Sequence, residues 1–526
     1  MDLAKKIISY MIILLGLAIV AGLVSASYLY LVPNSQIFGF YFISGSGTEF
    51  YDNYTEHLSE YEIIEVDTYK FNVEVFPQED DLGQVQVTFT NNAVGFANSG
   101  ETEFSYAINY DSVTKTIHIS TVEPTSGLIL YTDASLRVGF PNISSEKEII
   151  VNSHGGSVTL GTAGTVLETN DITITNGKAA MAIQNFTMNS ASTLSITNGA
   201  GITNIFGNVA GNVVIDSEIG SFNFANDAQT YFYNVGGDLN ILGDNPAVKV
   251  GDVAGDVSVY ADNGLLYTGT IDGGLTITTV NGEATIDKVM KNVTITSGYN
   301  TITINSIGEA ESSLYQASIN SDNGNIEIGD CYYELHAEAD RGSITVLNAY
   351  YDTYIQTTYG DVIVNYALDA NLLKNIEQAD SFKTLEVTTT EGNITATNLR
   401  TLTSLAVAES STAQIIADFL VINGHNTIVC GRRESIVRVP IDEHTLNVYT
   451  QSGDVNIQVG SAYKTSWQSS DLIDHEVNTT APASMTYGYT VQILSGGSAN
   501  LYVDNTLSVQ STTGKINVLT NENTLD

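Results

Sequence analysis

Basic residues are scarce in this chain of 526 residues, which has 19 Lys and Arg against 59 Asp and Glu and a formal net charge of -40. Proteins that bind nucleic acid or anionic lipid headgroups need a basic surface. The composition therefore excludes direct electrostatic attraction to either, and no nucleic-acid partner is expected. Solubility and repulsion between copies are the ordinary explanation for such an acidic surface.

Proline is rare as well, with 7 residues against 45 glycines. Together with the many Thr, Asn, Ser and Val residues, this composition is typical of a β-rich and turn-rich fold rather than of a disordered chain.

Sequence motifs for catalysis and for metal binding are absent. No two histidines have the spacing of metal ligands, and no zinc-protease helix motif or Cys-x-x-Cys pair occurs. The nucleophile elbow and the phosphate-binding loop are also missing. We therefore predict no catalytic and no metal-ligating residue. The histidines are His57, His118, His154, His336, His425, His444 and His475.

A short phrase recurs between Gly237 and Val364: glycine, a small polar residue, and two β-forming residues that flank a polar one. Fixed self-similarity of this kind is typical of a solenoid, in which each repeat buries its apolar face against its neighbours. The copies follow one another at a constant step, with one slip, and begin at Gly237, Gly255, Gly273 and Lys291 and then at Gly324, Gly342 and Gly360.

Alternate residues of the phrase, such as Leu239 and Ile241, share one face of a strand, while Asn240 lies on the other. A coil of this length is too short to contain a helix and fits strands wound around a narrow core. We predict an all-β fold, a parallel β-helix or β-solenoid with roughly 18-residue coils stacked at about 4.8 Å. Cys331 and Cys430 would then lie on the order of 20 Å apart. A disulfide needs Cα atoms within about 7 Å, so we expect two free, buried thiols.

The phrase also sets the predicted domain boundaries. Similar phrases extend from residue 151 to residue 526, which is the predicted solenoid, with an irregular insert near residues 366–385. Residues 61–150 contain alternating strands and an acidic turn, and we predict a β-rich N-terminal cap that covers the exposed first rung. Residues 33–60 have weak periodicity and are predicted to form a linker or stalk.

An apolar run without a charge extends from Ile7 to Val32 and is long enough to cross a bilayer as a helix. Lys5 and Lys6 precede the run, and the next basic residue is Lys70, so the positive-inside rule places residues 1–6 in the cytoplasm. We predict a retained signal anchor over residues 7–32, which makes this a single-pass protein of the cell membrane with its bulk extracellular. The alternative is a signal peptide cleaved after Val24-Ser25-Ala26.

Tyrosines cluster near the end of the regular repeats. Tyr332-Tyr333 and Tyr350-Tyr351 are separated by one step of the repeat, and Tyr354 and Tyr359 lie close by in the sequence. On successive coils these side chains would form a strip of rings. Because tyrosine combines a flat apolar face with a polar tip, the strip is a candidate binding surface for a glycan or a partner protein. The alternative is a buried or edge aromatic stack that stiffens the solenoid.

Carboxylates recur in the same register of successive coils, for example Asp238 and Asp256, with Asp252, Asp262 and Asp272 nearby. Glycoside hydrolysis needs two carboxylates at a set separation, and calcium takes six to eight oxygen ligands. However, Asp and Asn favour the turns of any coil, and this explanation covers more of these residues. We expect no cofactor, with calcium as the open alternative.

A second enzyme-like feature is Gly424-His425-Asn426 followed by Arg432-Arg433, which is similar to a site for sugar acids. Polysaccharide lyases and hydrolases occur among parallel β-helices. An enzyme that cleaves a polysaccharide therefore stays the alternative from a different functional class.

Three further segments, Ile64-Glu65-Val66-Asp67, Val73-Glu74-Val75 and the turn Glu79-Asp80-Asp81, precede the ladder of glycine-Asp/Asn-aliphatic phrases. Over roughly residues 60–460 the sequence thereby resembles the bacterial putative adhesin family, a domain of unknown function. The resemblance implies an exported or membrane-anchored β-solenoid and carries no catalytic residues over to this chain. The insert near residues 366–385 departs from the family's regular ladder.

The predicted role is non-enzymatic adhesion or interaction at the cell envelope, with the membrane contacted through the N-terminal helix and a surface glycan or protein as ligand. A passive envelope spacer is a further alternative. Outward carboxylates gathered in one groove would favour the enzyme, whereas carboxylates spread evenly over the coils would favour a binder or a spacer.

Overall fold

The structure is a computed structural model. It describes residues 13–21, 24, 36–37, 40–44, 48–53, 57, 60–69, 71–78, 84–89, 94–97, 105–122, 127–131, 134–141, 147–161, 167–177, 179–184, 186–226, 230–367, 383–408, 410–419, 425–433, 435–439, 445–450, 455–459, 490–492, 498–502, 508–510 and 515–520.

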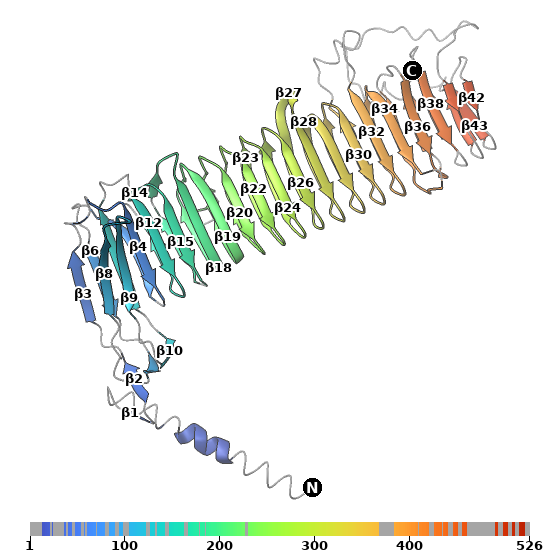
Figure 1. The fold of residues 1–526 in the computed structure, drawn as a ribbon. Helices are drawn as coiled ribbons and strands as arrows, with labels where there is room; N and C mark the ends of the chain where they lie inside the picture. Colours follow the sequence, from blue (N-terminus) through green and yellow to red (C-terminus); the bar gives the residue numbers. More distant parts are fainter. Residues whose placement is uncertain are drawn as a thin grey trace, which may run out of the picture. The chain divides into compact units, whose positions relative to one another are not determined.

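Over these residues the chain is an all-β parallel β-solenoid of about 12 turns, which confirms the predicted fold class (Figure 1). It divides into two compact units, residues 1–237 and residues 238–526.

The strands of the first unit are β1 (Gln36–Ile37), β2 (Phe40–Ser44), β3 (Thr48–Asn53), β4 (Ile63–Thr68), β5 (Asn72–Gln78), β6 (Gln84–Phe89), β7 (Val94–Ala97), β8 (Ser105–Asp111), β9 (Thr116–Val122), β10 (Gly127–Tyr131), β11 (Ala134–Pro141), β12 (Glu148–Ser153), β13 (Val158–Leu160), β14 (Leu167–Thr169), β15 (Ile172–Asn176), β16 (Met181–Gln184), β17 (Phe186–Met188), β18 (Thr193–Phe206) and β19 (Asn212–Asn223).

The strands of the second unit are β20 (Leu239–Gly243), β21 (Ala247–Lys249), β22 (Val257–Ala261), β23 (Leu265–Ile271), β24 (Leu275–Thr279), β25 (Glu283–Val289), β26 (Val293–Ser297), β27 (Ile302–Ser321), β28 (Ile326–Ala339), β29 (Ile344–Ala349), β30 (Thr353–Thr357), β31 (Val362–Tyr366), β32 (Thr384–Thr389), β33 (Ile394–Leu399), β34 (Leu402–Val407), β35 (Ile415–Phe419), β36 (His425–Cys430), β37 (Ser435–Val439), β38 (Thr445–Thr450), β39 (Val455–Val459), β40 (Thr490–Gln492), β41 (Ser498–Tyr502), β42 (Ser508–Gln510) and β43 (Lys515–Thr520).

Parallel pairing in the first unit starts before residue 151, the predicted start of the solenoid. β4 pairs in parallel with β12, and β5 pairs in parallel with β13, so a first coil lies inside the predicted cap segment 61–150. The same segment also supplies β6 and β8, which pair antiparallel with β11 and β9. β3, from the predicted linker, pairs antiparallel with β6. β9 and β11 pair in parallel with the other edges of β4 and β5, so parallel stacking begins at β9 and β11, inside the predicted cap.

Among the described N-terminal residues, 13–21 and 24 are helical. Within the part of the chain that the structure describes, no helix has both the length and the apolar character needed to cross a bilayer. Most of the predicted membrane helix, residues 7–32, lies outside the described residues, and this helix stays a prediction.

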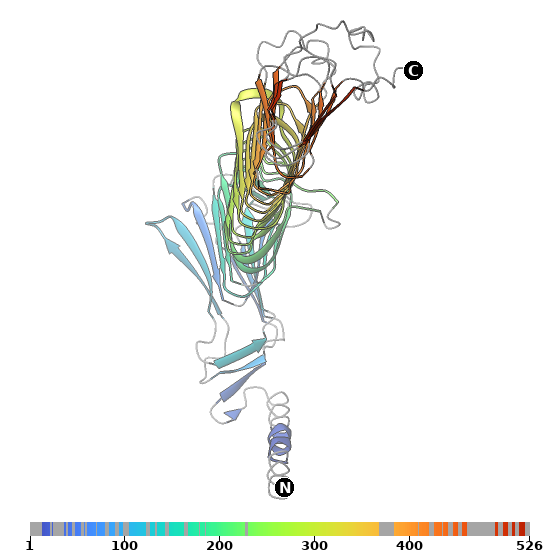
Figure 2. The same cartoon turned by 90° about the vertical axis from the view of Figure 1, so that its right-hand side faces the viewer.

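The second unit consists of two parallel sheets that face each other and are joined by turns (Figure 2). Sheet 1 contains β20, β22, β24 and β26, and sheet 2 contains β21, β23 and β25. From one coil to the next, Leu239 is aligned with Val257, then with Leu275 and Val293, which confirms the predicted length of the coil.

The core of this unit follows from the alternation along each strand. Leu239 and Ile241 are 0% and 1% exposed, whereas Asn240 between them lies on the outer face. Cys331 and Cys430 are buried and form no disulfide, as expected. Each coil thus contributes its β-branched and aliphatic residues to one continuous interior, since a narrow coil has no other place to bury them.

Between β20 and β34 two interruptions break the period. Val293 is aligned with Ala317 and Thr353 is aligned with Leu385, and both steps are longer than that of a regular coil. The second interruption corresponds to the predicted insert near residues 366–385. Its segment from Asp369 to Ser381, predicted as a short helix or an insert, lies outside the described residues.

Candidate functional site: a tyrosine edge between two insertions

Four of the predicted tyrosines lie at one corner of the second unit, where the chain passes from sheet 2 to sheet 1. In an uninterrupted coil this corner is a short turn, such as Met290 to Asn292 between β25 and β26. The next corners of this short form are Tyr332 to Glu334, within β28, and Tyr350 to Asp352, between β29 and β30. We call these two turns the tyrosine edge.

Both interruptions of the period occur at this same corner. Residues 308–316 take the place of the short turn within β27, and we call them the first insertion. Residues 367–384 take its place between β31 and β32, and we call them the second insertion. The tyrosine edge therefore consists of the two coils that lie between the insertions.

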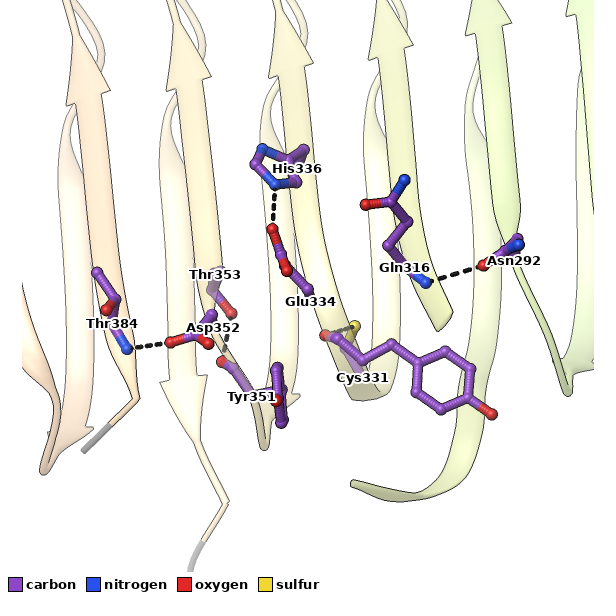
Figure 3. A network of polar contacts seen from close by, with 10 residues as sticks. Asn292, Gln316, Cys331, Glu334, His336, Tyr351, Asp352, Thr353 and Thr384 are labelled. Atoms are coloured by element: carbon purple, nitrogen blue, oxygen red, sulfur yellow. Dashed lines mark hydrogen bonds and ion pairs between the residues drawn. The ribbon is translucent and has the colours of Figure 1, made fainter. Parts of the chain in front are cut away.

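The first insertion is closed by a side chain from each neighbouring coil. Asn292 Oδ1 accepts a hydrogen bond from the backbone N–H of Gln316 at 3.0 Å (Figure 3). Tyr333 is only 4% exposed, and its hydroxyl donates to the carbonyl of Met290 at 2.5 Å. Gly308 opens the insertion with a φ of 79°, and a Cβ there would lie 2.5 Å from the Tyr333 ring. Glycine at this position is required both by the left-handed backbone and by the ring.

The second insertion is held by a side chain from the preceding coil and by one from β31, the strand that leads into it. Asp352 Oδ1 accepts the backbone N–H of Thr384 at 2.5 Å (Figure 3). Tyr366, 1% exposed, directs its hydroxyl at the carbonyl of Tyr351, at 3.1 Å. Burial raises the pKa of Tyr366, so its hydroxyl stays protonated and available as a donor. Each insertion is thus accompanied by a tyrosine whose hydroxyl donates to a carbonyl of the coil before the insertion.

The outward tyrosines of the edge stack on each other. The rings of Tyr332 and Tyr350 are 4.1 Å apart between centroids and 14° from parallel. Tyr354, on the adjoining strand β30, stacks at 4.6 Å and 14° on His336 of the preceding coil. His336 Nε2 also lies 2.7 Å from Glu334 Oε1 (Figure 3). The predicted strip of rings therefore exists, as two stacked pairs.

Tyr351 has a cation on its ring. The Nζ atom of Lys383, at the end of the second insertion, lies 3.4 Å from the ring centroid. The same ammonium lies 3.5 Å from the carboxylate of Glu311, which belongs to the first insertion. Because these contacts join both insertions to Tyr351, the short turn Tyr350 to Asp352 is held between them.

The surroundings of the edge are acidic. Burial raises the pKa of Tyr354, and the carboxylates of Asp352 and Glu334 raise it further. A hydrogen bond of 2.8 Å to Glu309 raises the pKa of Lys288, with its nitrogen as the donor. The phenol of Tyr354 therefore remains a neutral donor at physiological pH, in a field that favours positive charge.

Tyr359 is the one predicted residue that the structure places elsewhere. It lies in the opposite turn, between β30 and β31, where its side chain is 51% exposed. The guanidinium of Arg341, one coil earlier, lies 5.7 Å from its ring centroid. Tyr359 thus belongs to a different edge of the coil.

Three residues in the contacts around the tyrosine edge, His336, Glu311 and Lys383, were not predicted from the sequence. His336 precedes Tyr354 by one regular step, so the period alone was sufficient to find it. Glu311 and Lys383 lie in the insertions, where the period fails, and no sequence signal connects them.

The recurring carboxylates serve the turns. Asp256 N–H donates to Asp238 Oδ1 at 2.8 Å, and Gly274 N–H donates to Asp256 Oδ1 at 2.7 Å. Asp252 Oδ1 accepts the N–H of Thr270 at 2.7 Å in the same way. Each of these carboxylates caps the backbone of the next coil, which is the turn explanation weighed above. Among the described residues no group of three or more His, Cys, Asp or Glu side chains could hold a metal ion.

The candidate sugar-acid residues are only partly described. Asn426 is fully buried, and its Oδ1 accepts the backbone N–H of Thr403 at 2.8 Å. Arg432 and Arg433 are exposed. The amide oxygen of Asn426 therefore supports the fold at this position.

No family model and no curated protein matches the chain. Two solved structures are similar to it. One is a putative cell adhesion protein from Clostridium sporogenes, with 9% identity and a TM-score of 0.17, covering 55% of this chain and 100% of that one. The other is a putative adhesin from Parabacteroides distasonis, with 12% identity and a TM-score of 0.15, covering 79% of this chain and 94% of that one. Both descriptions agree with the family that the sequence resembles. At such TM-scores neither similarity bears on the site.

Proposed function

We propose that this protein is a surface-exposed β-solenoid, anchored in the cell membrane through residues 7–32, with a non-enzymatic role in adhesion or in interaction at the cell envelope. Its ligand, a surface glycan or a protein, binds at the tyrosine edge. The membrane anchor and the extracellular location are argued from the apolar run and the charge asymmetry of the N-terminus.

The observation that supports this site is the accumulation of aromatic side chains between the two insertions. In the regular coils the last residue of the corner, such as Asp238 or Asp256, accepts a backbone N–H of the next coil. At the tyrosine edge, Tyr332 and Tyr350 stack on each other in the register that Met290 holds on a regular coil. Aromatic side chains at a surface are typical of binding sites, because they give a large contact area at a small entropic cost.

The carboxylates favour a binder over an enzyme. They are spread over successive coils, where Asp238, Asp252 and Asp256 each accept a backbone N–H, and the hydrolysis of a glycosidic bond would need two that are held free at a set separation.

The test is binding of the full chain, purified in detergent micelles, to an array of glycans and matrix proteins. The site variant replaces Tyr332 and Tyr350 by Ser and leaves the buried Tyr333 in place. The matched control replaces Tyr260 and Tyr299 by Ser, since these side chains are 50% and 51% exposed on regular coils. We expect saturable binding that the control retains and the site variant loses.

Binding that both variants retain would move the site away from the tyrosine edge. No binding by the unmodified chain would leave the passive spacer as the better account. Shortened glycans on the array would favour the alternative function, an enzyme that cleaves a polysaccharide.

A further inference from the structure

The orientation of the stacked rings limits what the tyrosine edge can bind. Tyr332 and Tyr350 lie on successive coils, and their centroid distance of 4.1 Å is shorter than the usual strand spacing of about 4.8 Å. The ring faces therefore point along the direction in which the coils stack, and each ring covers one face of the other. The hydroxyls and ring edges are left at the side. A pyranose ring needs an open aromatic face, which this arrangement does not offer at the side of the coil.

The tyrosine edge already holds a positively charged group. The ammonium of Lys383 lies 3.4 Å from the centroid of the Tyr351 ring and 3.5 Å from the Glu311 carboxylate. A cation on a ring face with a carboxylate beside it gains from both the ring quadrupole and the ion pair. The side chains of Lys383 and Glu311 are 25% and 40% exposed, so solvent reaches this contact and another cation can compete for it.

The charged groups around this contact favour a cationic ligand. Glu334, Asp352 and Glu386 are the carboxylates that act on Tyr354, next to the edge. Lys288 is paired with Glu309 of the first insertion at 2.8 Å. An anionic glycan would be repelled by this surface, and a neutral glycan would gain nothing from it. An arginine or lysine side chain gains from both the rings and the carboxylates, and a guanidinium can also extend a ring stack.

We propose that the Tyr351 ring and the Glu311 carboxylate form a binding site for a cationic side chain, which Lys383 fills in the free molecule and an arginine or lysine of a partner protein takes over on binding. This inference rests on the proposed function, because it specifies the ligand of the same edge. The partner is then a protein segment with exposed basic residues, and Lys383 is the internal competitor that it displaces.

The decisive variant is Lys383→Ala in the full chain, with Lys249→Ala as its control. Both remove one positive charge from the second unit, but Lys249 lies on the outer face of β21, on a regular coil. The probe is a short peptide in which arginine alternates with serine, titrated at about 50 mM salt, where surface charges are weakly screened. A peptide with citrulline in place of arginine keeps the shape of the side chain and removes its charge.

We expect Lys383→Ala to bind the arginine peptide about fivefold more tightly than the unmodified chain. The cation–π contact and the exposed ion pair of Lys383 then no longer compete with the peptide. Lys249→Ala should change the affinity less than twofold, and the citrulline peptide should not bind. In the Lys383→Ala background, Tyr351→Phe should keep the gain and Tyr351→Leu should abolish it, because only the first retains the ring face. Circular dichroism and the melting temperature confirm that each variant is folded.

An equal gain in Lys383→Ala and Lys249→Ala would show only general attraction to an acidic protein and would overturn the cation site. So would a gain that survives Tyr351→Leu, or arginine-peptide binding that is undetectable in Lys383→Ala. If the array finds a neutral glycan that requires Tyr332 and Tyr350 while the arginine peptide fails, the inference is wrong and the proposed function stands. If neither probe binds, both fail.

Discussion

The coils from Leu239 to Val293 and those from Ile302 to Leu385 have the same two sheets and the same kind of interior, but they differ at one corner. In the first group the corner is a short turn, and a carboxylate such as Asp256 caps the next coil. In the second group two of the corners are expanded into insertions.

The difference shows what an insertion demands of a solenoid. Side chains hold both ends of each longer turn. Tyr333 and Tyr366 do this from inside, and Asn292 and Asp352 pin the chain at the end of each insertion. The regular coils share the second device, since Asp256 Oδ1 accepts the N–H of Gly274 in the same register. The aromatic side chains at this corner therefore have two roles, with the inward ones supporting the fold and the outward ones available for binding.

The largest expected effect is on stability, when a tyrosine that points into the interior is removed. It tests whether the inward and the outward tyrosines have separate roles. Tyr366→Ala should destabilise its coil by about 3–5 kcal/mol, as for other buried aromatic residues, because it leaves a cavity in the interior. Tyr359→Ala, at an exposed ring, should cost less than about 1 kcal/mol. Long repeat proteins do not unfold in one step, so amide hydrogen exchange in β31 and β32 is the appropriate measurement. Similar protection in both variants would mean that Tyr366 does not support the insertion.

A smaller loss of stability should distinguish a corner with an insertion from a regular corner. Asp352→Ala should cost about 1–3 kcal/mol, because the N–H of Thr384 loses its acceptor at a half-buried position. Asp256→Ala removes the equivalent acceptor of Gly274 at an exposed position, where water replaces it, and should cost about 1 kcal/mol or less. Exchange rates of the Thr384 and Gly274 amides measure both. A larger loss at Gly274 would contradict the idea that the insertions depend more strongly on their closing side chains.

The smallest expected effect concerns the two thiols. Burial raises the pKa of both Cys331 and Cys430 to about 12. At pH 8 about one thiol in 10⁴ is then ionised in the folded state, and iodoacetamide should label neither residue until the chain unfolds. Cys331 is next to the tyrosine edge, whereas Cys430 is outside the two insertions. Faster labelling of Cys331, read by mass spectrometry, would show that the insertions loosen the coils between them.

Much of the fold was predictable because apolar residues recur in the sequence at the length of one coil. Leu239, Val257, Leu275 and Val293 recur once per coil and are aligned in the structure. The stacking of Tyr332 on Tyr350 followed from the same step. The first parallel pairings were less accessible, since β4 and β12 are paired although the chain makes a long excursion between β5 and β12. Local patterns do not record such a distant pairing.

The candidate site was predictable only in part. The repeat step placed tyrosines on successive coils, but the pattern did not separate Tyr333, which fills the interior, from Tyr332, which faces outward. The contact of Lys383 with Tyr351 and Glu311 joins residues from two insertions, where the period is lost.

The sequence by itself determined the strands, their alternation and the regular length of the coil, because a strand with one buried face imposes its period on the residues that form it. Only the tertiary structure decided which side chains meet at the corner. Stacking brings residues of successive coils into contact, and an insertion changes which residues these are without changing the pattern of the strands beside it.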